Sequence, residues 1–256
     1  MTNRKHLLGS VILLLTLTNN MSANDNINTF INANKVKIVS QSLAKNYLYI
    51  HQNLQVSAAK LALKKNILSL NQSIKDMQSQ TNSKDTQELV EFMFFSSDEL
   101  NTILTEEFTP ENGGLILDYT ESLLEGSDLI AKQSISKKDN KNLEMLERVG
   151  EMKYLLERAA KYYIAFRAGY TDTVNVEQAN SAVQEFSSLL EGIKSHPYPT
   201  EIQNGSVKKL LKYWAVSKNF FLGIKKSKLP SIVFISTKHM DAALENIAEY
   251  HRKEIK

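Results

Sequence analysis

The sequence predicts an all-α protein made of two tandem antiparallel helical bundles with long helices. Apolar residues recur at spacings of three and four along most of the chain, which is the periodicity of one face of a helix. The stretch Lys37–Tyr49 returns as Lys153–Ala165, with Lys153 in the place of Lys37. Only 9 Gly and 4 Pro occur in 256 residues, fewer turn residues than regular hairpins need. A repeated helical pattern indicates a duplicated module.

Residues 1–23 have the pattern of a signal peptide. Arg4 and Lys5 form a positive start, Leu7–Leu17 is a short apolar core, and small residues end at Ala23. The apolar run is well below the roughly 20 residues that span a bilayer. We therefore expect export to the periplasm with cleavage near Ala23; an uncleaved N-terminal anchor is the alternative. A lipoprotein anchor is excluded because the chain has 0 Cys.

The charge balance argues against a nucleic-acid partner. The chain has 31 basic and 28 acidic residues, and removing Arg4 and Lys5 leaves 29 against 28. No long basic stretch offers the charged surface that a phosphate backbone needs. Without cysteines the exported chain has to fold without disulfides, which a core of this size allows.

The first predicted module covers residues 24–140. An almost unbroken helical pattern over 26–80 predicts one long helix or a helix pair, and a second helix follows from about 85 to 104. Thr109 and Pro110 then form a helix start, with a hydroxyl cap and a proline in the first turn. The amphipathic segment 115–130 completes the module.

The second predicted module covers residues 141–256 and follows a polar, charged boundary at 134–142. Gly169 is placed to cap the C-terminus of the first helix, and Pro230 separates the last two. The predicted helices are 143–168, 176–194, one from about Thr200 to the region before Pro230, and 232–250.

The repeated motif carries a basic face in each module. Residues four apart share one face of a helix, and two such trios occur, namely Lys37, Gln41, Lys45 and Lys153, Glu157, Lys161. If the modules pack with pseudo-twofold symmetry, Lys37 and Lys153 approach each other and clamp a small anion. The alternative is two solvated faces, on which Lys153, Glu157 and Lys161 form helix-surface ion pairs.

The aromatic and acidic residues have structural interpretations that compete with functional ones. Trp214 shares the apolar stripe of its helix, so we expect it in the core. Five tyrosines either line an apolar pocket or belong to the core, and the core is favoured; they are Tyr47, Tyr49, Tyr154, Tyr162 and Tyr163. An acidic helix face indicates solvent exposure rather than a metal site; it comprises Glu106, Glu107, Asp118, Glu121, Glu125 and Asp128.

No catalytic constellation is present in the sequence. It contains no cysteine nucleophile and no HExxH, P-loop or GxSxG motif. We therefore expect a protein that is not an enzyme and has no catalytic residues, metal or cofactor.

The first motif resembles a known family. Ala33–Lys45 reads ANKVKIVSQSLAK and is similar to AGRQRMLSQRMAK of the PilJ-type module. That module forms the periplasmic N-terminal part of type IV pilus methyl-accepting chemotaxis transducers, and the sensor bundle of NarX-type nitrate/nitrite kinases is related to it. The second copy, Val149–Lys161, keeps Gly150, Arg158 and Lys161 of the motif. The likeness extends over nearly all of the chain after residue 23, as two copies.

The resemblance implies a helical sensor module outside the cytoplasmic membrane. In the nitrate-sensing relatives an Arg of this motif from each of two subunits holds the anion. Here that role falls on Lys37 and Lys153, within one chain or across a homodimer, with Ser40, Gln41 and Arg158 as further contacts. In this sequence lysine replaces that arginine, whose planar guanidinium binds nitrate through two hydrogen bonds.

Two functions follow as hypotheses. The first is a periplasmic sensor that binds a small ligand, with an anion as the candidate, and presents it to a membrane chemotaxis transducer, because no transmembrane segment or signalling domain follows in the sequence. The second is an envelope or type IV pilus interaction module with no small ligand, which a large exposed apolar patch would favour.

Overall fold

The structure is a computed structural model that describes residues 23–81, 83–134 and 141–255, and every regular element in these ranges is a helix. This confirms the predicted all-α fold class. The predicted signal peptide lies outside the described residues, except for its last residue, Ala23, and so does most of the predicted boundary at 134–142. The helices are α1 (Ala23–His51), α2 (Val56–Gln80), α3 (Lys84–Ile103), α4 (Pro110–Ser134), α5 (Lys141–Arg167), α6 (Thr173–Ser195), α7 (Glu201–Leu222) and α8 (Pro230–Glu254).

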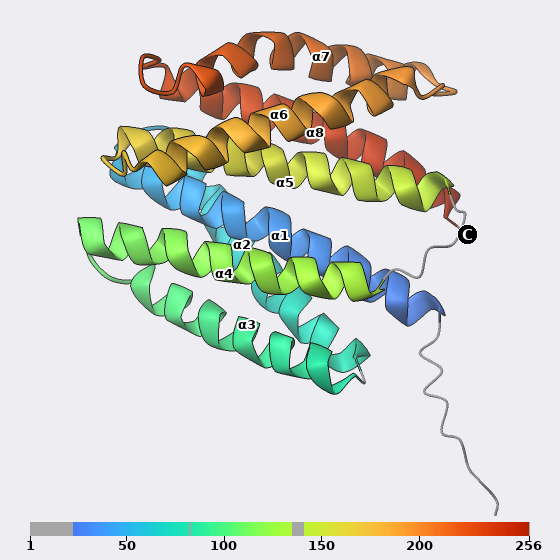
Figure 1. The fold of residues 1–256 in the computed structure, drawn as a ribbon, viewed down its shortest axis with the longest axis horizontal. Coiled ribbons are helices and arrows are strands. Elements are labelled where there is room, and N and C mark those ends of the chain that lie inside the picture. Colours follow the sequence, from blue (N-terminus) through green and yellow to red (C-terminus); the bar gives the residue numbers. More distant parts are fainter. Residues whose placement is uncertain (1–22, 82, 135–140, 256) are drawn as a thin grey trace, which may run out of the picture.

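The helices pack as two groups of four, each around its own apolar core. One core is built from α1 to α4 and the other from α5 to α8, and few residues cross between them. The two groups meet where α1 lies beside α5 at the middle of the molecule, with α3 and α7 at opposite ends (Figure 1). We call this contact the junction.

At the junction α1 and α5 run in the same direction. Asn34 lies beside Gly150 near the start of the contact, and Lys45 lies beside Glu157 further along both helices. The repeated motif supplies the contacting residues of both helices. Helices α1 and α5 therefore contact each other through corresponding parts of the motif.

The long pattern over 26–80 folds as a helix pair. Asn53 and Gln55 adopt the left-handed backbone conformation, with φ of 56° and 51°, and this reverses the chain between α1 and α2. A left-handed backbone is uncommon for residues other than glycine. No Gly or Pro marks the turn, which is why the sequence left a single long helix open as an alternative.

Three other helix boundaries were predicted correctly from the sequence. Gly169, with φ of 104°, follows the end of α5 as the expected cap. The backbone N–H of Asn112 donates a 3.0 Å hydrogen bond to Thr109 Oγ1, so Thr109 caps α4. Pro230 occupies the first turn of α8.

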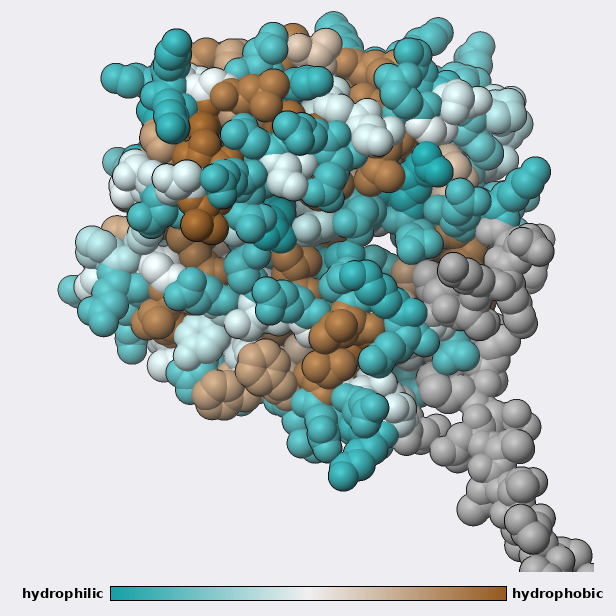
Figure 2. Space-filling view, viewed as in Figure 1, coloured by the Kyte–Doolittle hydropathy of each residue, from teal (hydrophilic) through white to brown (hydrophobic). Residues whose placement is uncertain are grey.

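Most of the aromatic residues of the repeat are core residues. Tyr47, Tyr49, Tyr162 and Tyr163 are buried, and Trp214 packs in the second core, as expected. Hydrophilic side chains cover most of the face shown in Figure 2, with apolar patches between them. Among the described residues, no helix has the length and apolar character needed to cross a bilayer.

Candidate ligand site at the junction

The repeated basic faces are buried, not solvated. Lys37, Lys45 and Lys161 are at most 7% exposed, because these faces of α1 and α5 meet at the junction. The expected helix-surface pairs within α5 are wrong: Glu157 pairs across the junction with Lys45, at 2.6 Å. Periodicity located the face correctly but not its environment, which depends on which helix packs against it.

Lys37 and Lys153 occupy equivalent places, and each is paired with two carboxylates. Lys37 Nζ lies 2.8 Å from Asp128 Oδ1 of α4 and 2.7 Å from Glu151 Oε2 of α5. Burial lowers the pKa of Lys37, but the two carboxylates outweigh it and raise the pKa above its ordinary value.

Lys153 pairs in the same way with Asp241, at 3.3 Å, and with Glu245, both on α8. Burial again lowers its pKa, and the carboxylates raise it by more. Both lysines are therefore protonated, with their charges already compensated within the protein.

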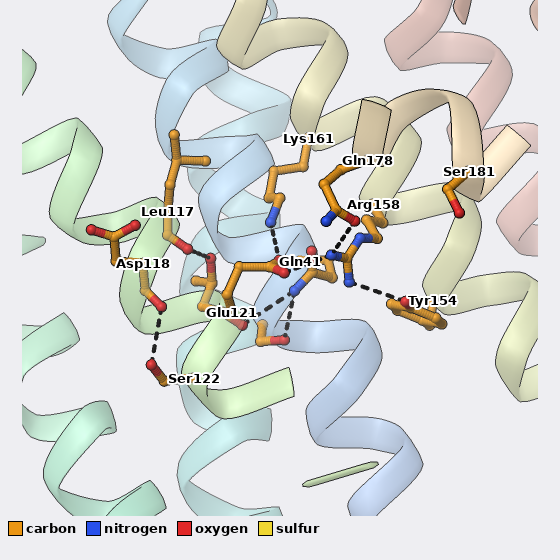
Figure 3. A network of polar contacts seen from close by, with 12 residues as sticks. Gln41, Leu117, Asp118, Glu121, Ser122, Tyr154, Arg158, Lys161, Gln178 and Ser181 are labelled. Atoms are coloured by element: carbon orange, nitrogen blue, oxygen red, sulfur yellow. Dashed lines mark hydrogen bonds and ion pairs between the residues drawn. The ribbon is translucent and has the colours of Figure 1, made fainter. Parts of the chain in front are cut away.

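Arg158 belongs to a buried network on one side of the junction (Figure 3). Its Nη2 donates to Glu121 Oε2 at 2.7 Å and to Gln178 Oε1 at 2.8 Å, and its Nη1 donates to Tyr154 Oη at 3.0 Å. Lys161, which is fully buried, donates to the other carboxylate oxygen of Glu121. This network joins α4, α5 and α6.

Burial and charge pairing shift the pKa values of the network in opposite directions. Burial raises the pKa of Glu121, but the charges of Lys161 and Arg158 outweigh burial and hold the pKa below its ordinary value. Burial lowers the pKa of Lys161 to about 8, because Glu121 compensates only part of the desolvation. At neutral pH all three groups are charged.

Ser40 and Gln41 are fully buried in α1 and bond within the protein. Ser40 donates to the carbonyl oxygen of Lys37 at 3.0 Å, and Gln41 donates to the carbonyl oxygen of Thr120 at 3.2 Å. The Oε1 atom of Gln41 is buried and accepts no hydrogen bond from any residue that the structure describes. Neither residue lines the two cavities described next.

Two cavities flank the junction. One, of about 490 Å³, lies between α1, α2, α5 and α8, and we call it the α2–α8 cavity. The other, of about 560 Å³, lies between α1, α4, α5 and α6, and we call it the α4–α6 cavity. Since α2 corresponds to α6 and α8 to α4 in the repeat, the cavities are equivalent sites of the two modules.

The structure separates the two lysines proposed to clamp an anion. Lys153 lines the α2–α8 cavity, whereas Lys37 and Arg158 line the α4–α6 cavity. Phe30 and Asn34 line both, so the cavities lie on two sides of the same part of α1.

The cavity walls contain as many carboxylates as cations or more. Three of each line the α2–α8 cavity, namely Lys35, Lys153 and Arg252 against Glu157, Asp241 and Glu245. The α4–α6 cavity has four cations, Lys37, Lys132, Arg148 and Arg158, and five carboxylates, Glu125, Asp128, Glu144, Glu147 and Glu151. Neither wall has the excess positive charge that selects a simple anion.

Several residues of these walls were not expected from the sequence. Asn66 comes from α2, Asp241 and Glu245 from α8, and Glu157 was assigned to the solvated face. The i, i+4 spacing of Asp241 and Glu245 was a detectable signal, because it places both on one face of a helix. Nothing in the sequence marked Asn66.

The predicted acidic face is only partly a solvated surface. Glu121 and Asp128 turn towards cations of α1 and α5. Within the part of the chain that the structure describes, no group of three or more His, Cys, Asp or Glu side chains is arranged to hold a metal ion.

Comparison of the chain with protein-family models, curated proteins and solved structures gives no match. Function is therefore inferred from the repeated motif and from the geometry of the junction.

Proposed function

We propose that this is an exported, non-enzymatic helical protein that binds a small ligand in the α2–α8 cavity and presents the bound state to a membrane signalling partner. The observation that supports the proposal most directly is the cavity of about 490 Å³ at the junction, lined by both modules. Its volume is within the range of small-molecule sites. The likeness of both repeated motifs to the PilJ-type module, and the signal-peptide pattern of residues 1–23, support the sensor role and the periplasmic location.

The position of the cavity suits a sensor. Its walls come from α1 and α2 of one module and from α5 and α8 of the other, so a bound molecule contacts both. A ligand that prefers one arrangement of α1 against α5 shifts the protein towards that arrangement. A partner docked across the two modules would respond to that shift.

The α2–α8 cavity is the better ligand site of the two. It combines apolar side chains, including Ile31, Ile38 and Leu146, with a few charged groups, as ligand sites commonly do. In the α4–α6 cavity, by contrast, Arg158 already fills part of the space and bonds to Glu121 and Gln178.

Filling the α2–α8 cavity from its own wall is expected to abolish ligand binding without loss of stability. Gly150 lies in a helix and lines the cavity, and a Cβ there meets only Asn34, at an ordinary 3.8 Å. Gly150→Leu therefore gains about 0.5–1 kcal/mol of helix propensity and places a side chain in the cavity. Thermal shift with a panel of small molecules measures both effects, because a ligand at a hundred times its Kd adds roughly 2.7 kcal/mol.

Gly205→Leu is the matched control. Gly205 lies on α7, away from the cavity, and a Cβ there has no neighbour within 4 Å. The Gly205→Leu variant should gain similar helix propensity and keep every ligand-induced shift of the melting temperature. Equal ligand response in the two variants would rule out the α2–α8 cavity as the site.

Single lysine variants distinguish the two cavities. We expect Lys153→Ala to weaken ligand binding about tenfold or more, since Lys153 lines the α2–α8 cavity as a charged hydrogen-bond donor. Lys37→Ala, the equivalent change in the other module, should bind normally. Titration calorimetry on both variants is the measurement. Loss of binding in Lys37→Ala alone would move the site to the α4–α6 cavity.

An interaction module without a small ligand is the second candidate. It is favoured by large apolar side chains exposed on α2 and α3, which are Leu61 at 58%, Leu68 at 64%, Phe92 at 48% and Phe95 at 57%. A stable protein whose melting temperature no small molecule changes would favour this candidate over the sensor.

A further inference from the structure

We infer that the α2–α8 cavity takes a small zwitterion, a molecule with one ammonium group and one carboxylate on a short apolar body. This inference rests on the proposed ligand-binding function and narrows it to one chemical class. It derives from a comparison of the two equivalent cavities, one of which contains a protein side chain where the other is open.

The two copies of the motif differ five residues after the repeated lysine. Arg158 occupies that position in α5, and Ser42 occupies it in α1. The guanidinium of Arg158 extends from α5 to Glu121 and Gln178. The hydroxyl of Ser42 is too short to extend in this way, so the α2–α8 cavity is open at the position that a cation fills in the α4–α6 cavity.

The carboxylates on the two sides differ accordingly. Glu121 is bound by two cations, Arg158 and Lys161. On the other side of the junction the carboxylate is Glu157, which occupies in α5 the position of Gln41 in α1, and it pairs with one cation, Lys45, the equivalent of Lys161. Glu157 is 5% exposed and lines the cavity, and its Oε2 accepts no well-directed hydrogen bond, although Lys45 Nζ lies 2.6 Å away. A ligand ammonium would supply to Glu157 the second positive charge that Arg158 supplies to Glu121.

A hydrogen-bond donor in the same wall needs an acceptor. The Nδ2 atom of Asn66 is buried and has no hydrogen-bond partner among the residues that the structure describes. A buried donor without a partner costs free energy, which a ligand oxygen would relieve. Glu157 thus requires a positively charged group of the ligand, and Asn66 requires a hydrogen-bond acceptor of the same ligand.

The remaining charges of the cavity wall favour a molecule of zero net charge that has one positive and one negative group. Lys153 lies one helical turn from Glu157, about 6 Å along α5, and Arg252 pairs with Glu245 on α8 at 3.4 Å. Because the three cations and three carboxylates of the wall balance, a simple anion or amine would bring an uncompensated charge into the cavity. The ammonium and the carboxylate of a zwitterion would each pair with an opposite charge of the wall. The net charge of the cavity would therefore stay the same.

The test uses the purified protein and molecules that share a carbon skeleton. Leucine, for example, is compared with 3-methylbutylamine, which has only the ammonium, and with 4-methylpentanoate, which has only the carboxylate. The other common amino acids are tested in the same way, together with nitrate, acetate and phosphate. We expect at least one zwitterion to raise the melting temperature, and its amine and acid counterparts to bind at least tenfold more weakly by calorimetry.

Asn66→Ala tests the site itself. Since Asn66 Nδ2 has no partner in the described part of the chain, its removal should leave the melting temperature of the free protein unchanged or higher. Binding of the zwitterion should weaken about tenfold or more, the effect of one lost hydrogen bond to a charged group. Asn219→Ala is the control, an exposed asparagine on α7 outside the cavity.

The outcomes separate the two proposals. Binding of an amine, an acid or an inorganic anion as tight as that of the zwitterion overturns the inference and leaves the ligand-binding function in place. Unchanged zwitterion binding in Asn66→Ala overturns the assigned position of the ligand. If no compound of any charge class binds, the proposed function itself is wrong.

Discussion

Replacing Glu121 with glutamine is expected to lower the free energy of unfolding by about 3–5 kcal/mol, the usual cost of removing one partner of a buried ion pair. Glu121 is the carboxylate that Lys161 and Arg158 share, and Lys161 is fully buried. Without it both cations remain in the junction with no opposite charge in the network. Urea unfolding followed by circular dichroism measures the loss.

The pH dependence of that loss identifies its cause. Burial already lowers the pKa of Lys161 to about 8 with Glu121 present, so in Glu121→Gln the lysine should shed its proton on folding. The cost of that deprotonation falls as the pH rises towards the ordinary lysine value near 10.4. The variant should therefore be less impaired at pH 9 than at pH 7.

An exposed carboxylate provides the control. Glu191 forms a surface pair with Lys194 at 3.3 Å, and both side chains are more than half exposed. Glu191→Gln should change the stability by no more than about 0.5 kcal/mol at either pH. An equally small effect of Glu121→Gln would show that the junction does not depend on this network.

Acid is expected to destabilise the second bundle through His251. This histidine of α8 is fully buried; its Nδ1 lies 3.0 Å from Asn142 Oδ1, and its Nε2 lies 3.4 Å from the hydroxyl of Tyr198. Around it lie Asn142 of α5, His196 and Tyr198 of the segment after α6, and Tyr250 of its own helix.

Burial, followed by the nearby His196, lowers the pKa of His251 to about 4 from an ordinary value of 6.5. A lowered pKa means that the unfolded chain binds the proton first. The stabilisation is thus fully present above pH 6.5 and is lost as the pH falls towards 4, amounting to roughly 3 kcal/mol.

His251→Gln separates this effect from the titration of carboxylates. Glutamine keeps a polar side chain at the site but has no charge to gain. Between pH 6.5 and 4 the wild-type protein should therefore lose roughly 3 kcal/mol more than the variant does, measured by urea unfolding at each pH. Parallel losses in the two proteins would contradict a neutral, buried His251.

The consequences for function differ between these two changes. Glu121 lies at the junction, so Glu121→Gln should loosen α5 against α4 and weaken any ligand that contacts both modules. The hydrogen-bond partners of His251, Asn142 and Tyr198, belong to the second bundle, and His251 lines neither cavity, so His251→Gln should leave ligand affinity at neutral pH unchanged.

How far the candidate site could be predicted is clear from individual residues. The repeat identified the lysines of the junction, and their equivalence, because duplicated helices keep their register. It did not identify their partners. Asp128 and Glu245 belong to helices far along the chain, and only packing brings them to Lys37 and Lys153.

By itself, the sequence determined that the chain is helical, where most helices begin and end, and that the pattern occurs twice. These properties are local: apolar periodicity, capping residues and the scarcity of Gly and Pro set them. Only the tertiary structure decided that the chain reverses at Asn53 and Gln55, that the basic faces are buried against each other, and that Lys37 and Lys153 lie in separate cavities. The physical reason is that burial and pairing of a charge depend on neighbours distant in sequence, and periodicity along one helix contains no information about those neighbours.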